Sequence, residues 1–219
     1  DQLRADFLTG AAINGWPSAD GAAAFSAIAQ RPAGRVWIVV PVTTALGLDD
    51  APCQLPGHGW VSAEQARAIG VTKVGVMVET PSAALQAAEL FEHVDFVSVG
   101  TNDLTQYAMA ADREGSGLGD LQDPWQPGVL RLLAAVGDAA AAAGKSAGVC
   151  GEAASDPLLA SVLVGMGMTI LSMSPRQLHA VGEALALVSM EQCRAAALAA
   201  TSAASPAAAR KAAREALGG

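Results

Sequence analysis

The feature that most constrains the fold is a regular alternation of short apolar runs with longer alanine-rich stretches. Short β-type runs occur at residues 35–40, 73–78, 94–99, 145–150 and 168–173, with a weaker one at 3–8. Helical stretches separate them, most clearly at 82–93, 127–143, 157–166 and 176–200. Strands that are apolar on both faces and alternate with helices form parallel sheets with right-handed crossovers. The chain is therefore predicted to be an α/β protein.

Chemically capable side chains follow several of these strands at their C-terminal ends. Glu79 follows one run, Asn102 and Asp103 follow the next, and Cys150 ends the run at 145–150. A barrel of alternating strands and helices builds its active site in this way, from the tips of neighbouring strands. No glycine-rich phosphate fingerprint follows the first strand, which argues against an open dinucleotide-binding sheet. We therefore predict a TIM-type (β/α) barrel.

The barrel is expected to be shortened in its N-terminal half. A complete barrel has eight strands and takes about 250 residues, whereas this chain has 219 residues with five clear strands and one weaker strand. Residues 43–70 are rich in Pro, Gly and Asp, which predicts a loop with one short helix at 62–69. We expect a single barrel domain over residues 1–200 and an alanine-rich terminal helix or tail over 201–219.

Charge and composition narrow the range of partners. The 13 Lys and Arg residues against 21 Asp and Glu give a net charge of −8, which disfavours binding to a nucleic-acid backbone. No apolar run reaches the roughly 18 residues of a membrane helix, and the N-terminus has no signal-peptide character. Cys53, Cys150 and Cys193 form an odd, widely spaced set that fits neither a disulfide framework nor a zinc site. We expect a cytoplasmic protein with no membrane or nucleic-acid partner.

Glu79 and Asp103 are a candidate pair of metal ligands. Each lies just past an apolar strand, and one helical crossover separates them, so adjacent strand ends would bring both carboxylates within reach of one cation. Two carboxylates with open water positions are typical of a Mg²⁺ site that also accepts substrate oxygens. The alternative is that each carboxylate caps a helix, since Glu79 precedes Pro81 and Asp103 begins a helical turn.

Cys150 and Arg113 are two further candidates. Cys150 ends a strand between glycines, where a thiol could give or take a proton; the alternative is a small buried apolar side chain. Arg113 could hold a phosphate by bidentate hydrogen bonds, or it could form a surface salt bridge. The histidines, His58, His93 and His179, have no motif around them and are expected to be structural or exposed.

Five strings in the second half of the chain resemble one family. They are GVMVETPSAA at 75–84, DFVSVGTNDLTQY at 95–107, ADR at 111–113, VCGEAA at 149–154 and LSMSP at 171–175. Together they resemble the C-terminal phosphoenolpyruvate-binding domain of Enzyme I, the phosphoenolpyruvate-protein phosphotransferase of the bacterial sugar phosphotransferase system. The resemblance runs from about residue 73 to 187. Pyruvate phosphate dikinase and phosphoenolpyruvate synthase carry related but more distant motifs.

The resemblance implies a phosphoenolpyruvate-binding barrel that dimerises and uses Mg²⁺. Glu79 and Asp103 match the family's Mg²⁺ ligands. Cys150 matches the acid that protonates C3 of the enolate to give pyruvate, a reasonable role for a positioned thiol. The family's histidine domain, which accepts the phosphoryl group, and its docking region for the phosphocarrier protein are both expected to lie outside this chain.

The phosphate-binding side of the match is less complete. Asn102 and Arg113 match residues that contact the substrate phosphate, and the string LRADFL at 3–8 is similar to a family strand whose arginine, here Arg4, does the same. The run at 38–42 aligns with either of two consecutive family strands. In both alignments at least one further substrate arginine and one to two strand–helix units are missing.

Three hypotheses about function remain open. The first is an enzyme domain that converts phosphoenolpyruvate to pyruvate while the phosphoryl group passes to a histidine on another domain. The second is a non-catalytic module that only binds phosphoenolpyruvate or dimerises, which the missing arginines favour. The third and weaker one is a Mg²⁺-dependent carbon–carbon lyase that acts through an enolate.

Overall fold

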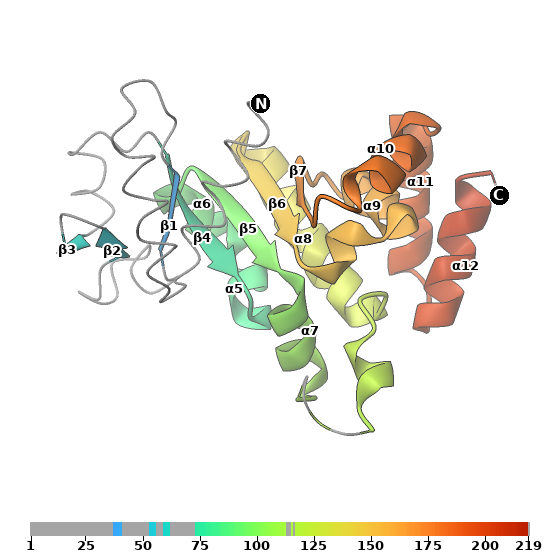
Figure 1. Ribbon diagram of the computed structural model, residues 1–219, viewed down its shortest axis with the longest axis horizontal. Coiled ribbons are helices and arrows are strands. Elements are labelled where there is room, and N and C mark those ends of the chain that lie inside the picture. Colours follow the sequence, from blue (N-terminus) through green and yellow to red (C-terminus); the bar gives the residue numbers. More distant parts are fainter. Residues whose placement is uncertain are drawn as a thin grey trace. The chain divides into compact units, whose positions relative to one another are not determined.

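The computed structural model describes residues 37–40, 53–55, 59–61, 73–112, 115 and 117–218 (Figure 1). The chain divides into two compact units. The first comprises Asp1–Met77 and His93–Phe96, and the second comprises Val78–Glu92 and Val97–Gly219. Among the described residues, no helix combines the length and apolarity needed to cross a membrane.

In the first unit, β1 (Trp37–Val40) pairs in parallel with β4 (Lys73–Val78), and Trp37 lies opposite Lys73. β2 (Cys53–Leu55) and β3 (Gly59–Val61) form an antiparallel two-stranded sheet. Residues 43–70, predicted as a loop with one short helix, therefore also contain two short strands. Three-residue strands are too short to show a period of two, although the Pro-Gly pair at 56–57 is a turn signal. The strand predicted at 3–8 and the helix predicted at 62–69 lie outside the described residues.

In the second unit, β5 (Phe96–Gly100), β6 (Ser146–Cys150) and β7 (Ile170–Ser172) are neighbours in chain order. β6 and β7 are parallel, with Cys150 opposite Ser172, and β5 and β6 point the same way in Figure 1. All five clear strands fall at or within two residues of their predicted bounds. The structure thus confirms a mixed α/β fold with a parallel sheet.

The core of the second unit is built from strands and helices that are apolar on the side they bury. Val97 and Val99 of β5 and Val149 of β6 are fully buried. Burying each such side chain contributes about 1.5–3 kcal/mol. The helices add further fully buried side chains: Leu130, Leu133 and Val136 from α8 (Pro127–Ala143), and Leu159, Val162 and Leu163 from α9 (Pro157–Gly165).

Two helices begin where the sequence predicts them. α8 matches its predicted range, and both α8 and α9 begin with a proline at the first helical position. The helix predicted over 82–93 is two helices, α5 (Pro81–Leu85) and α6 (Ala87–His93). α7 (Thr101–Met109) follows β5 directly. η1 (Gly119–Gln122) and η2 (Glu152–Ser155) are short 3₁₀ turns.

The single helix predicted over 176–200 was wrong. It is two helices, α10 (Leu178–Ala186) and α11 (Met190–Thr201). Ser189 starts α11 with a capping box: its hydroxyl accepts from the Gln192 amide at 3.2 Å, and the Gln192 side chain accepts from the Ser189 amide at 2.9 Å. Ser205 caps the last helix, α12 (Pro206–Ala216), which packs against α11 and α9.

Candidate functional site

Glu79 and Asp103 lie at the start of two crossovers. Glu79 follows β4, and the side chain that caps the next helix belongs to its neighbour Thr80, which accepts from the Ala83 amide at 3.2 Å. Asp103 lies in the first turn of α7, whose N-cap is Gly100. Neither carboxylate is an N-cap residue, so the capping alternative does not account for their positions.

The Glu79 carboxylate lies directly over Gly100. A Cβ atom at position 100 would come within 2.7 Å of Glu79 Oε1 and 2.8 Å of its Cγ, closer than real Cβ contacts allow. Burial raises the pKa of Glu79, and the negative charge of Asp103 raises it further. The two negative charges therefore repel each other.

The donor chemistry of this pair fits Mg²⁺. Within the part of the chain that the structure describes, no group of three or more His, Cys, Asp or Glu side chains converges as a metal cage. A pair of carboxylates leaves coordination positions for water and substrate oxygens, which is the common arrangement for Mg²⁺. Zn²⁺ and Ca²⁺ sites draw more of their ligands from the protein.

Cys150 lies beside this pair, at the end of β6. Its Sγ donates to the Val99 carbonyl oxygen at 3.4 Å. Burial raises the pKa of the Cys150 thiol; a hydrogen bond with Ser98 partly offsets this, and the charges of Glu79 and Asp103 raise the pKa further. The thiol is therefore protonated at neutral pH. That state suits a proton donor and does not suit a nucleophile.

Thr101 holds the chain at the thiol, and Asn102 lies close to the next residue, Gly151. Thr101 Oγ1 donates to the Cys150 carbonyl oxygen at 2.9 Å. Gly151 has a φ of 96°, and a Cβ atom there would come within 2.9 Å of Thr101 Oγ1 and 3.3 Å of Asn102 Oδ1. Position 151 thus needs glycine for both its backbone conformation and the close approach of α7.

The structure therefore brings together four of the six predicted site residues: Glu79, Asn102, Asp103 and Cys150. The other two, Arg4 and Arg113, lie outside the described residues. Sequence reasoning missed the supporting roles of Ser98 and Thr101. A usable signal was present for Ser98, which is a polar residue inside an otherwise apolar strand.

The other histidines and cysteines that the structure describes lie on other elements. His179 is exposed on α10, 3.2 Å from Glu183, and His93 ends α6. Cys193 is buried on α11 and Cys53 lies in β2. His58 lies outside the described residues.

Comparison with known proteins places the chain in a family. Residues 23–190 match the family described as PEP-utilising enzyme, PEP-binding domain. The chain is 53% identical over 139 residues to the phosphoenolpyruvate-protein phosphotransferase of Streptomyces coelicolor, covering 63% of this chain and 25% of that protein. It is 50% identical over 102 residues to the protein of the same name from Latilactobacillus sakei, covering 47% of this chain and 18% of the relative.

A third relative has a different name and a greater length. The chain is 44% identical over 128 residues to the multiphosphoryl transfer protein of Xanthomonas campestris pv. campestris, covering 57% of this chain and 15% of that protein. The chain thus spans a quarter or less of the length of these curated relatives. The family match covers most of the chain and includes Glu79, Asn102, Asp103 and Cys150. This chain belongs to the family of PEP-utilising enzymes, as a PEP-binding domain.

Proposed function

We propose that this chain is the phosphoenolpyruvate-binding domain of an Enzyme I-like phosphotransferase, in which phosphoenolpyruvate loses its phosphoryl group and becomes pyruvate. One observation carries the proposal: the Cys150 thiol at the end of β6 donates to the Val99 carbonyl oxygen and lies close enough to Glu79 and Asp103 for both charges to raise its pKa. The relatives named phosphoenolpyruvate-protein phosphotransferase support the reaction.

Glu79 and Asp103 are the residues that would hold Mg²⁺. When bound there, Mg²⁺ would supply positive charge to the phosphate and enolate oxygens of the substrate. The raised pKa of Glu79 supports this role, because a cation beside the pair would favour the ionised carboxylates. Gly100 keeps the space over α7 open for the Glu79 carboxylate.

Cys150 supplies the proton in the proposed reaction. The bond between phosphorus and the enol oxygen breaks, and the phosphoryl group passes to an imidazole nitrogen of a histidine on another domain. The electron pair of the broken bond stays on the oxygen, which gives the enolate of pyruvate. C3 of the enolate takes the thiol proton, and the resulting thiolate regains a proton from water.

The phosphate side of the site is proposed from the family strings. Asn102 lies beside Gly151, where its amide can donate to a phosphate oxygen. Arg113 and Arg4 would supply the positive charge. We further propose that the sheet is part of a shortened (β/α) barrel, and that the protein dimerises and acts in the cytoplasm with a phosphohistidine domain and a phosphocarrier protein.

Exchange of the C3 protons of pyruvate with deuterated solvent tests the assignment by NMR. We expect exchange that depends on Mg²⁺ and falls at least about 100-fold in Cys150→Ala, since general acids contribute that much or more. Cys193→Ala, which removes the buried thiol on α11, is the matched control and should exchange like the wild type.

Other outcomes would favour the alternatives. Phosphoenolpyruvate binding in calorimetry with no exchange in the wild type would indicate a non-catalytic binding module. Turnover of oxaloacetate without exchange of pyruvate would indicate a lyase. Exchange that survives Cys150→Ala would remove the thiol from the mechanism.

A further inference from the structure

Arg210 of α12 is joined to the segment between η1 and α8. Its Nη1 donates to Asp123 Oδ2 at 2.6 Å and its Nη2 to Asp123 Oδ1 at 2.8 Å. The guanidinium also lies over the Trp125 ring, 5.5 Å from its centroid. A planar fork matched to a carboxylate and stacked on an indole is a specific arrangement that lysine does not reproduce.

Trp125 links Asp123 to Asp156 through hydrogen bonds of its backbone and its side chain. The side chain is fully buried, and its backbone amide donates to Asp123 Oδ1 at 2.9 Å. Its Nε1 donates to Asp156 Oδ2 at 3.0 Å. The other oxygen of Asp156 caps α9 by accepting from the Leu158 amide at 2.9 Å. Asp156 is therefore held from two sides.

Asp156 ends the short segment that begins at the thiol. Residues 150–156 run from the end of β6 through Gly151 and η2 to the start of α9. Thr101 fixes the first residue of this segment through the Cys150 carbonyl, and Trp125 fixes the last through Asp156. Because both ends of the segment are held, the direction in which the chain leaves Cys150 depends on the contacts of Thr101 and of Trp125.

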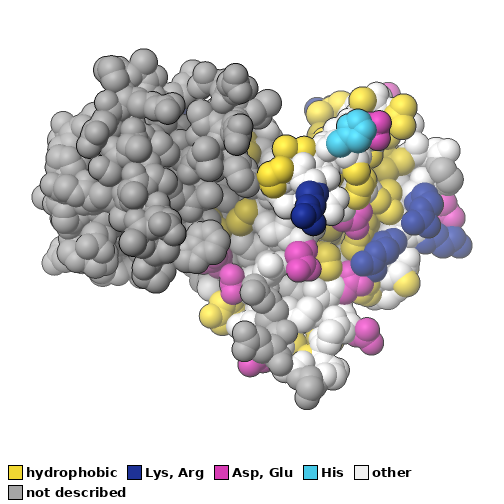
Figure 2. Space-filling model, viewed as in Figure 1, with side chains coloured by type: hydrophobic (Ala, Val, Ile, Leu, Met, Phe, Trp, Pro, Cys, Tyr) yellow, Lys and Arg dark blue, Asp and Glu magenta, His cyan; other side chains and the backbone are white. Residues whose placement is uncertain are grey.

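We propose that Arg210 is a positioning residue for Cys150: by clamping Asp123 and Trp125 it holds the Asp156 end of segment 150–156. Arg210 lies outside residues 23–190, so the family match assigns it no role. Figure 2 shows several Lys and Arg side chains on the surface of the described part of the chain. Arg210 forms a two-bond pair with a carboxylate, Asp123, on another element. The proposal rests on the proposed function only where it concerns proton transfer.

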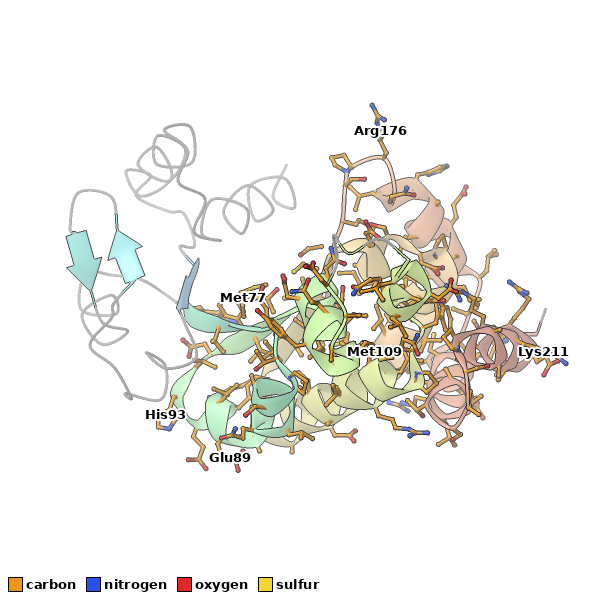
Figure 3. The ribbon with its side chains drawn as sticks, turned by 90° about the horizontal axis from the view of Figure 1, so that it is seen from below. Met77, Glu89, His93, Met109, Arg176 and Lys211 are labelled. Carbon is orange, nitrogen blue, oxygen red and sulfur yellow. The ribbon has the colours of Figure 1, made fainter. Side chains whose placement is uncertain are left out.

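Hydrogen exchange tests the clamp without any assay of activity. In the full chain, Arg210→Gln should make the amides of segment 150–156 exchange about tenfold faster in mass spectrometry, because local opening becomes easier. Lys211→Gln is the matched control: Lys211 is on the same helix, 78% exposed, and points outward in Figure 3. Ser189→Ala removes the α11 cap and controls for general loss of stability.

Two further variants sharpen the result. Trp125→Phe keeps a ring in the core but removes the bond to Asp156, and it should speed exchange of the same amides even if Arg210→Gln fails to fold. Arg210→Lys should restore protection only in part. The clamp is overturned if segment 150–156 keeps wild-type protection in Arg210→Gln, or if Ser189→Ala loosens it equally.

The role in catalysis needs a second readout. Arg210→Gln should slow exchange of the C3 protons of pyruvate about tenfold and leave the affinity for phosphoenolpyruvate and Mg²⁺ within about twofold of wild type. An equal loss of affinity and rate would overturn the role in positioning the thiol. A wild type that neither binds phosphoenolpyruvate nor exchanges pyruvate would refute the proposed function, while the amide measurement would still decide the clamp.

Discussion

The Glu79 carboxylate lies between a backbone that leaves it little room and a second carboxylate that repels it. Burial and the charge of Asp103 both disfavour its ionised form. Gly100 is the residue that permits its approach to α7. A carboxylate whose pKa is raised by burial and by a like charge is a candidate for a functional site, which agrees with the proposed role of Glu79.

Ionisation of Glu79 should therefore lower the free energy of unfolding as the pH rises. Because its pKa is raised in the folded protein, the folded state binds more protons than the unfolded chain between the ordinary value near 4.5 and the raised one. The free energy of unfolding falls as the pH rises through this window. Glu79→Gln should remove that fall. At pH 7 the free energy of unfolding of this variant should be higher than that of the wild type, by less than about 1 kcal/mol because the site is partly solvated.

Urea unfolding at pH 4 and pH 7 measures this difference. Glu89→Gln is the control, since Glu89 is an exposed carboxylate on α6 that points outward in Figure 3. A Glu79→Gln variant that is less stable than the wild type at pH 7 would contradict the prediction.

Gly100→Ala should weaken Mg²⁺ binding more than folding. The added methyl group would meet the end of the Glu79 side chain, which can move aside and thereby leave its ligand position. We expect the affinity for Mg²⁺, measured by calorimetry, to fall about tenfold. Gly128→Ala is the control, because a Cβ atom there meets nothing within 4 Å. Unchanged Mg²⁺ affinity in Gly100→Ala would argue against Glu79 as a ligand.

Helices α8, α9 and α11 pack so closely that glycine is needed at their contacts. A Cβ atom at Gly137 of α8 would lie 1.8 Å from the Met166 carbonyl oxygen, at the end of α9. One at Gly165 of α9 would lie 2.0 Å from the Cys193 carbonyl oxygen of α11. Both obstacles are backbone atoms, which cannot rotate away as a side chain can.

Gly165→Ala should therefore destabilise the fold despite the better helix propensity of alanine. We expect a loss of about 2–3 kcal/mol in urea unfolding, because α9 and α11 must separate. Gly182→Ala on α10, where a Cβ atom meets nothing within 4 Å, should instead raise stability by about 0.5–1 kcal/mol. If Gly165→Ala raised stability as much as Gly182→Ala, helix propensity would outweigh packing at this contact.

At the scale of the whole molecule, ligand binding should raise the free energy of unfolding of the chain. Phosphoenolpyruvate with Mg²⁺ at about 100 times its dissociation constant should stabilise the chain by about 2.7 kcal/mol. For a chain of this length that raises Tm by about 5–10 °C. EDTA should abolish the rise, and Asp103→Asn should reduce it. A rise that persists in EDTA would place the ligand away from the carboxylate pair.

Local sequence patterns predicted much of the fold and part of the site. The strand ending at Val78 and the helix beginning at Pro127 depend on an apolar run and on a proline start, which neighbours in sequence supply. The break at Ser189 was missed, although its capping box is also local, because the alanine-rich run around it favoured one continuous helix. The strands β2 and β3 were missed because three residues carry too little periodicity.

The sequence by itself determined the α/β alternation, the family, and the identity of the chemically capable residues at the strand ends. Only the tertiary structure decided which other residues contact and hold these side chains and the segments around them. Thr101 meets Cys150 across 49 residues, and Arg210 meets Asp123 across 87. These pairs follow from how helices and strands pack in three dimensions, and no local pattern at either end of a pair specifies its partner.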